Sequence, residues 1–238
     1  MNAIFGSRKS NGESGEHWLT ISDLMAGLMM VFLFIAIVFM RHTMKENEKI
    51  KNVAIAFQEN QVAIYTALTK EFQYDLADWG AAIDKDTLAF NFNSPDVLFD
   101  NGEIELKPTF TNILNDFFPR YLNVLKPFRD SLNEVRIEGH TSSAWNIAST
   151  DSEAYFNNMR LSQGRTRSVL SYLYGLVPDE TDWIKRSIAA VGFSSSRLIF
   201  NEDGTEDAEQ SRRVSFRAIT NADIQIKRIL EGTNEANG

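Results

Sequence analysis

The hydrophobic pattern is strongest near the start of the chain, from Trp18 to Met40. Leu24–Met40 holds seventeen residues without a charged side chain. A helix needs about 20 predominantly apolar residues, each rising ~1.5 Å, to cross the hydrocarbon core of a bilayer. The pattern therefore predicts a transmembrane helix over residues 18–40. A signal peptide is disfavoured because Arg41 and Lys45 follow, not small residues of a cleavage site. A buried helix of a soluble protein would rarely be apolar on every face.

One carboxylate, Asp23, lies inside this segment. An ionised Asp near the middle of a membrane helix costs on the order of 3 kcal/mol, so we expect it to have a partner or a task. Gly27 and Phe34 share its face at helical spacing, and the small Gly27 lets another helix approach closely. We predict that Asp23 faces a partner helix or a narrow water path, where it takes up and releases a proton. The alternative is a shallow position from which Asp23 reaches the headgroups.

Two polar regions flank the span. Residues 1–17 form a Gly/Ser-rich tail, and residues 41–85 show an amphipathic pattern. Ile50, Phe57 and Ile64 recur every seven residues, with charged and amide side chains between them. This pattern predicts a linker helix that continues the membrane helix. It fits a weak coiled coil with a second copy, and it fits a helix lying on its own domain almost as well.

From residue 86 the pattern alternates between strand and helix. Short alternating runs predict strands at 87–92, 135–139, 187–192 and 214–219. Longer periodic stretches predict helices at about 108–125 and 155–176. This order predicts an α+β chain whose residues 86–220 form a two-layer α/β sandwich, followed by a C-terminal tail at 221–238.

Composition narrows the classes of function. The net charge is −8, which disfavours a nucleic-acid partner. The chain has no cysteine and three scattered histidines, so thiol catalysis, disulfides and a Cys- or His-based metal site are not expected. No phosphate-binding glycine loop or nucleophile elbow occurs. We therefore expect no enzyme activity, no metal and no cofactor.

The basic residues around the span give a conflicting indication of topology. Arg8 and Lys9 precede it, whereas Arg41, Lys45 and two further lysines follow it. Basic residues concentrate on the cytoplasmic side of membrane spans. Counted alone, they would put the C-terminal domain in the cytoplasm.

Five motifs resemble a known family. VLFDNGEIELKP, VRIEGHT, NMRLSQGRTRSVLSYL, AAVGF and SRRVSF occur in the order found in OmpA-like peptidoglycan-binding domains, over roughly residues 86–220. A preceding transmembrane helix with a single Asp narrows the resemblance to MotB-like stator subunits of ion-driven motors. Among these, MNAIFGSRKS and SDLMAGLMMVFLF look most like the MotB-like subunits of Zorya antiphage defence systems. The resemblance implies an OmpA-like fold.

The resemblance also implies site residues. The membrane Asp that carries protons falls on Asp23. The peptidoglycan-binding positions of the helix motif fall on Asn158, Leu161 and Arg165. An Arg beside an amide suits the carboxylates of a stem peptide, such as those of diaminopimelate. On residue types alone, a core Leu161, a helix-capping Asn158 and an ion-paired Arg165 are equally good explanations.

The strand-end motif places Thr141 and Ser142 at the same site, with one departure. Ser142 stands where the family has the Asp that holds the stem-peptide amine. Asp151 or Glu153 are candidate substitutes. Of the paired arginines, Arg212 and Arg213, one is expected to brace the sheet or a nearby carboxylate, with ligand binding the lesser expectation.

The function expected from the resemblance is a proton-driven, stator-like subunit that acts in antiphage defence. Its partners would be a ring of a MotA-like (ZorA-type) membrane subunit, a second copy of this chain, and peptidoglycan. It would sit in the bacterial inner membrane with a cytoplasmic N-terminus and a periplasmic C-terminal domain. The alternatives are a flagellar MotB-type stator and a passive OmpA-like envelope anchor, and a peptidoglycan hydrolase is the disfavoured enzyme alternative.

Overall fold

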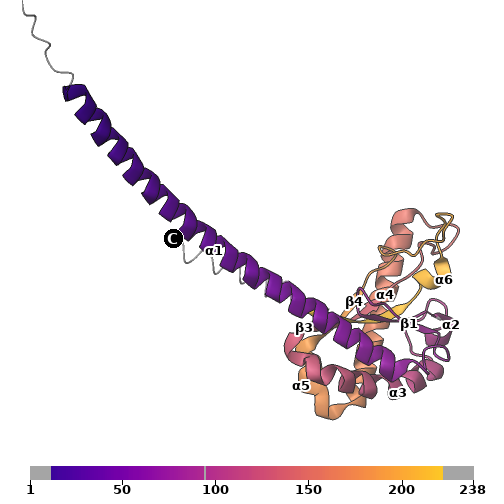
Figure 1. Ribbon diagram of the computed structural model, residues 1–238. Helices are drawn as coiled ribbons and strands as arrows, with labels where there is room; N and C mark the ends of the chain where they lie inside the picture. Colours follow the sequence, from indigo (N-terminus) through magenta and orange to yellow (C-terminus); the bar gives the residue numbers. More distant parts are fainter. Residues whose placement is uncertain (1–11, 94, 222–238) are drawn as a thin grey trace, which may run out of the picture. The chain divides into compact units, whose positions relative to one another are not determined.

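The computed structural model describes residues 12–93 and 95–221 (Figure 1). The chain divides into two compact units, residues 1–52 and residues 53–238. Helix α1 (Gly12–Phe72) runs from the first unit into the second, which also holds a mixed sheet and its helices. The α+β class predicted from the sequence is confirmed. The predicted N-terminal tail up to residue 11 and the C-terminal tail from residue 222 lie outside the described residues.

The N-terminal part of α1 is apolar and exposed. The helix begins at Gly12, ahead of the Trp18 boundary expected from the hydrophobic pattern. Leu24, Met30 and Phe34 are 75%, 74% and 68% exposed. Among the described residues, one helix, α1, is long enough and apolar enough to cross a membrane. Burying one large apolar side chain is worth about 1.5–3 kcal/mol, so such a continuous apolar surface indicates an apolar environment around it.

The C-terminal part of α1 packs on the second unit. Ile64, Leu68 and Phe72 are fully buried in its core. They recur every fourth residue and so form one stripe along the helix. This part of α1 therefore follows the second interpretation of the amphipathic pattern, a helix lying on its own domain.

Arg120 of α3 (Pro108–Leu125) fastens the end of α1. Its guanidinium donates to a carboxylate oxygen of Glu71 at 2.7 Å, to the main-chain oxygen of Glu71 at 2.9 Å, and to the carboxylate of Asp75 at 2.8 Å. It also lies 4.8 Å from the centre of the Phe72 ring. Because a planar guanidinium can serve several acceptors at once, one side chain joins α1, the turn after it and α3.

The turn after α1 leads into a strand that the sequence pattern did not indicate. α1 ends at Phe72, before the expected end at residue 85, and β1 follows at Ala81–Ile83. Gly80 has φ +57°, a left-handed conformation that disfavours residues with a side chain. The reversal lets the Ala81 N–H donate to the Leu76 carbonyl at 2.8 Å, and β1 then pairs with β2.

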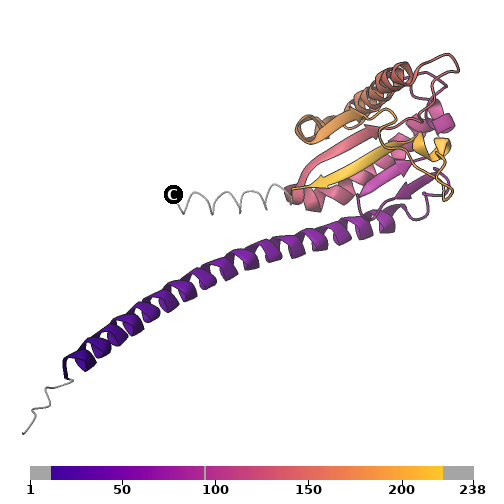
Figure 2. The same ribbon diagram turned by 90° about the horizontal axis from the view of Figure 1, so that it is seen from above.

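The sheet has five strands in the order β1–β2–β5–β3–β4 (Figure 2). β3 and β4 are parallel and are connected through α4 (Asp151–Leu176), whereas all other neighbours are antiparallel. The four strands expected from the sequence are present with small shifts at their ends: β2 (Ala89–Phe92), β3 (Leu132–Gly139), β4 (Ile188–Gly192) and β5 (Val214–Thr220). The short helices are α2 (Pro95–Leu98), α5 (Thr181–Ser187) and α6 (Ala208–Ser211), with 3₁₀ turns at Lys126–Ser131 and Pro178–Glu180.

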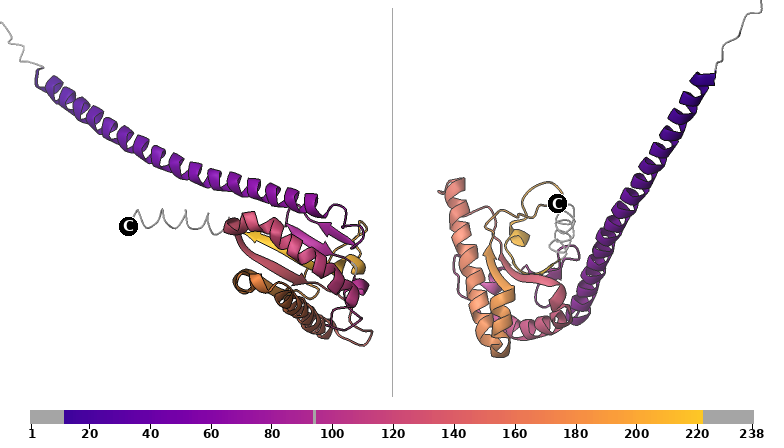
Figure 3. Two further views of the ribbon diagram at one scale, coloured as in Figure 1. Left: turned by 90° about the horizontal axis from the view of Figure 1, so that it is seen from below. Right: turned by 90° about the vertical axis from the view of Figure 1, so that its left-hand side faces the viewer.

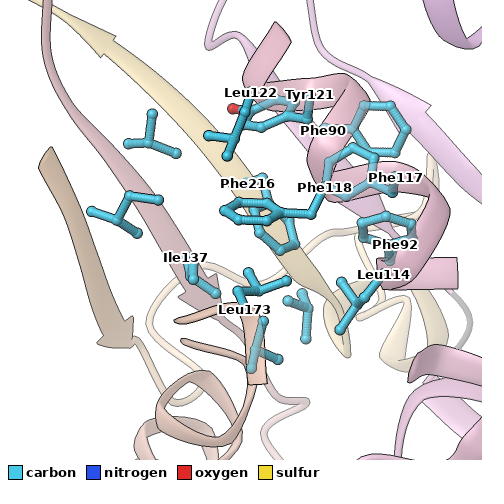
Figure 4. Close-up of a cluster of buried hydrophobic side chains, with 14 of the residues drawn as sticks. Phe90, Phe92, Leu114, Phe117, Phe118, Tyr121, Leu122, Ile137, Leu173 and Phe216 are labelled. Carbon is cyan, nitrogen blue, oxygen red and sulfur yellow. The ribbon is translucent and has the colours of Figure 1, made fainter. Parts of the chain in front are cut away.

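The core lies between one face of the sheet and the helices α1, α3 and α4 (Figure 3). Aromatic rings dominate it. The centre of the Phe117 ring of α3 lies 4.6 Å from the ring centre of Phe90, 5.1 Å from that of Phe92 and 5.0 Å from that of Phe216 (Figure 4). Each such aromatic pair is worth about 0.5–1.5 kcal/mol beyond burial of its area. Helices on one face of the sheet give the two-layer sandwich predicted from the strand and helix order.

Two paired glycines set how closely α4 approaches the sheet. Gly139 of β3 and Gly192 of β4 are partners in the ladder. A Cβ on Gly139 would lie 2.8 Å from the Ser162 carbonyl oxygen, and one on Gly192 would lie 2.4 Å from the Gln163 nitrogen. Backbone of α4 therefore occupies the space that side chains would need, and α4 lies directly over the ends of β3 and β4.

Gly192→Ala is expected to destabilise the second unit by about 1–3 kcal/mol, the usual cost of overpacking a close contact. The matched control is Gly175→Ala, also a Gly-to-Ala change in this unit, because a Cβ there meets nothing within 4 Å. Gly175 lies inside α4, so its replacement should be neutral or stabilising by up to ~1 kcal/mol. Thermal unfolding in detergent measures the change in stability of each variant. Equal melting temperatures would contradict the close approach of α4.

Candidate functional site

A pocket of about 410 Å³, here called the Thr141 pocket, opens where β3 ends beside α4. Three parts of the chain form it: the loop after α2, the loop after β3, and one side of α4, with one residue from the segment before β5. Its lining residues are Phe99, Asn101, Gly102, Thr141, Ser142, Ala144, Trp145, Asn158, Leu161, Arg165 and Arg212.

Asn158 holds the loop after β3 against α4. Its amide nitrogen donates to the carbonyls of Ser142 and Ala144, at 3.1 and 3.2 Å. Both amide hydrogens are thus used inside the protein, and Asn158 offers a ligand only its side-chain carbonyl oxygen. The helix itself begins earlier, where Thr150 and Glu153 form a reciprocal capping box.

Small hydroxyl residues pin the same part of α4 to the ends of the strands. The Ser162 hydroxyl oxygen accepts from the Ser194 N–H at 3.1 Å, and the Ser194 hydroxyl donates to the Tyr155 carbonyl at 2.7 Å. Ser194 in turn accepts from the Thr141 N–H at 3.0 Å. These contacts fix the Thr141 pocket from beneath, so its walls are preorganised.

Arg165 forms the floor beside the loop after α2. Its Nε and Nη2 donate to the carbonyls of Glu103 and Asp100, at 2.8 and 3.1 Å, and the guanidinium lies 4.7 Å from the Phe99 ring centre. Burial, followed by the positive charge of Arg212, lowers the pKa of Arg165 to about 10. The group therefore stays charged at neutral pH, and an incoming anion would relieve the repulsion between the two arginines.

Several polar groups in the Thr141 pocket have no partner in the described part of the protein. The Thr141 hydroxyl is buried and makes no hydrogen bond, and the Ser142 hydroxyl and the Arg212 guanidinium make none either. An unpaired buried polar group costs about 1–3 kcal/mol. Free hydroxyls beside two guanidinium groups suit a carboxylate, which accepts hydrogen bonds from all of them.

Residues 98–212 match the model of the OmpA family. The Zorya protein ZorB of Escherichia coli is 51% identical to the chain over 234 residues, which cover 97% of this chain and 100% of that protein. The chain belongs to the ZorB family of Zorya proteins. Similar solved structures include a putative MotB like protein from Desulfovibrio vulgaris, 20% identical, with TM-score 0.48 over 68% of this chain and 95% of that chain. The cell wall anchor of the T6SS from Pseudomonas aeruginosa is 21% identical, with TM-score 0.44 over 64% of this chain and 96% of that one.

In this ZorB-family chain, the residues expected at a peptidoglycan site come together. Asn158, Leu161, Arg165, Thr141 and Ser142 all line the Thr141 pocket. The structure does not match the three structural explanations that residue types left open, which were a core Leu161, a helix-capping Asn158 and an ion-paired Arg165. Leu161 is only half-buried, Asn158 is not the helix cap, and Arg165 binds carbonyl oxygens where an ion pair was the alternative.

The two carboxylates considered as substitutes for the missing Asp do not line the pocket. Asp151 lies in the first turn of α4, and Glu153 is engaged with Thr150. Of the paired arginines, Arg213 braces the segment before β5 by donating to carbonyls of Arg197 and Ser211, at 3.3 and 3.2 Å.

Arg212 lines the Thr141 pocket, and so do Trp145 and Phe99, which were not among the residues expected from the motifs. Adjacent arginines look alike in a motif, and only the direction of each side chain shows that Arg213 braces the chain while Arg212 lines the pocket. For Trp145, an aromatic side chain in a polar loop was a usable signal.

Glu138 of β3 and His140, the first residue after that strand, form a buried pair. Their side chains are 4% and 1% exposed, with His140 Nε2 at 3.4 Å from the Glu138 carboxylate. Burial lowers the pKa of His140, so its ring is neutral at neutral pH. Burial alone would raise the pKa of Glu138, but His140, Arg197 and Arg217 outweigh it and keep that pKa below its usual value. Neither side chain lines the Thr141 pocket.

Asp23, the expected proton carrier, belongs to the first unit, and its side chain is exposed on α1. In the described residues no group of three or more His, Asp or Glu side chains is arranged to hold a metal ion.

Proposed function

We propose that this chain is the peptidoglycan-anchored, stator-like subunit of an inner-membrane motor in Zorya antiphage defence. One observation carries the proposal: a single chain combines a pocket lined by two arginines with an apolar segment, residues 18–40, that holds one carboxylate, Asp23. The first fits attachment to a fixed support and the second fits ion transfer, and a motor subunit needs both. The 51% identity to the Zorya protein ZorB of Escherichia coli supports the assignment to defence.

The anchoring half rests on the Thr141 pocket. Stem peptides of peptidoglycan carry free carboxylates, and the pocket presents Arg165, Arg212 and the unpartnered Thr141 hydroxyl. A carboxylate held by these groups gains charge-assisted hydrogen bonds. The function is binding rather than catalysis, since hydrolysis needs a positioned general acid and base, and Glu138 and His140 lie outside the pocket.

The motor half rests on Asp23. Two copies of the chain would insert their apolar helices inside a ring of a MotA-like (ZorA-type) subunit. Protonation of Asp23 removes its charge and changes its contact with the ring, and release of the proton on the other side resets it. The peptidoglycan-bound domain then gives the ring a fixed point against which to turn.

This mechanism requires the second unit to be periplasmic, against the count of basic residues around the span. The chain has no cysteine, so Glu202→Cys creates one thiol at an exposed position of the second unit. In cells with a permeabilised outer membrane, a membrane-impermeant maleimide should label this variant fully. The control is a thiol placed at Asn11, which should react only after the inner membrane is disrupted. Labelling of Asn11→Cys but not Glu202→Cys in intact inner membranes would overturn the proposed topology.

Two other functions predict different outcomes in cells. A flagellar MotB-type stator would restore motility to a strain without stators. A passive envelope anchor would work without Asp23. Phage protection that depends on Asp23, in a strain whose motility this chain does not restore, separates the proposed function from both.

A further inference from the structure

The Thr141 pocket continues into a groove along α4. Two neighbouring hollows, of about 600 and 440 Å³, follow one another on the exposed side of this helix. The first shares Gly102, Trp145 and Leu161 with the Thr141 pocket. The second shares Ile104, Gly164 and Arg167 with the first. We call these two hollows the α4 groove.

The groove has the length of a short extended peptide. It runs along α4 from Leu161 to Tyr172, and at ~1.5 Å per helical residue this is about 16 Å. An extended chain advances about 3.3–3.6 Å per residue. The α4 groove therefore accommodates roughly four or five residues beyond the ligand in the Thr141 pocket.

The two walls of the groove carry opposite charges. Arg160 and Arg167 line the α4 side, and neither has a hydrogen-bond or ion-pair partner among the described residues. Glu103 and Glu105 line the opposite side, and their carboxylates are likewise unpaired there. Such walls suit a chain that carries both carboxylates and an ammonium group.

The charged side chains that line the Thr141 pocket are all positive. Its described lining holds Arg165 and Arg212 but no acidic side chain. The nearby Glu206 is not available, because its carboxylate accepts from the main-chain N–H and the hydroxyl of Ser143. A carboxylate is well served in this pocket, whereas an ammonium group would lose water and face two guanidinium groups without a counter-charge.

From these charges we propose that the site selects cross-linked peptidoglycan, an inference that rests on the anchoring function proposed above. In a cross-link, the side-chain amine of one stem peptide's diamino acid is acylated by the terminal D-alanine of a second stem. The acylated residue keeps its carboxylate but has lost its ammonium charge, which matches the Thr141 pocket. The second stem lies in the α4 groove, with its carboxylates toward Arg160 and Arg167 and its own free amine toward Glu103 and Glu105.

The test uses full-length protein in detergent and two ligands from one muramidase digest, a cross-linked dimer of tetrapeptide stems and the tetrapeptide monomer. Calorimetry should give a dissociation constant about tenfold lower for the dimer, the effect of roughly one charge-assisted contact. Arg160→Gln combined with Arg167→Gln should weaken dimer binding about tenfold and leave monomer binding unchanged. Arg186→Gln, an exposed and unpartnered arginine on α5, is the matched control and should change neither.

A second variant tests the pocket from the opposite direction. Ser142→Asp supplies a carboxylate for a free amine and should raise monomer affinity, so that the preference for the dimer narrows. Equal affinity of the wild type for both ligands would overturn the selectivity and leave the anchoring function intact. If neither the dimer nor the monomer bound, both the selectivity and the anchoring function would be overturned. An equal loss of both ligands in the double arginine variant would remove the groove's proposed role.

Discussion

Asp23→Asn is expected to abolish protection against phage, so that plaquing rises to the level of cells without the defence system. Asn is nearly the same size as Asp but cannot exchange a proton at neutral pH, so the variant keeps the shape of α1 and loses the ion carrier. Asp23 is the acidic residue at the head of a run of seventeen uncharged positions, Leu24–Met40, and a neutral side chain there should favour membrane insertion. Amounts of membrane-inserted protein and of its complex with the ring subunit should therefore be normal.

Two controls separate loss of the carrier from damage to the helix. Asp23→Glu retains a carboxylate and should keep part of the protection, whereas Ser22→Ala changes the neighbouring position and should keep all of it. Full protection by Asp23→Asn at native expression would refute the motor mechanism and favour a passive envelope anchor. Loss of the protein from the membrane would instead identify a structural role for Asp23.

Arg212→Gln is expected to weaken binding to purified peptidoglycan sacculi by roughly 30- to 150-fold, the equivalent of about 2–3 kcal/mol for one charged hydrogen-bond partner. Arg212 lines the Thr141 pocket and has no hydrogen-bond or ion-pair partner in the described protein. Its replacement should therefore leave the melting temperature unchanged or raise it slightly, because the repulsion with Arg165 is removed. Co-sedimentation with sacculi and a thermal melt of the same sample measure both quantities.

Arg165→Ala and Arg213→Gln are the comparison variants for Arg212→Gln, because their expected effects on binding and stability differ from it. Arg165 faces the pocket and also holds the carbonyls of Asp100 and Glu103, so its loss should reduce both binding and stability. Arg213 braces the chain before β5 and does not line the Thr141 pocket, so its loss should act mainly on stability. Sacculus binding that is unaffected by Arg212→Gln would remove the assigned ligand contact.

The sequence predicted the architecture where one pattern dominated. The uncharged run of α1 and the alternating strands need no tertiary information, and α3 occupies Pro108–Leu125 as expected. β1 escaped prediction because Ala81–Ile83 is too short to show alternation and depends on the reversal at Gly80. The end of α1 was misjudged for a related reason, since Leu76 and Trp79 continue the apolar pattern of the helix although the chain has already turned.

The members of the candidate site were predictable, but their roles were not. Five residues expected from the motifs do line one pocket. Residue type alone could not reveal that the Asn158 amide donates both of its hydrogens to carbonyls of the loop after β3, or that Arg165 donates to main-chain oxygens. These roles depend on carbonyl groups, which every residue carries and no sequence pattern marks.

The contact between α1 and α3 has a mechanical consequence. A pull applied along the axis of α1 would load the buried stripe Ile64–Leu68–Phe72 and the contacts of Arg120 at the end of the helix. Such a load shears the whole contact at once, so the stripe and the Arg120 contacts resist together. A helix pulled away sideways would peel off one residue at a time. Resistance to forced unfolding depends on the unfolding rate under load, and parallel loading of many contacts lowers that rate, which suits the proposed role of a tether under torque.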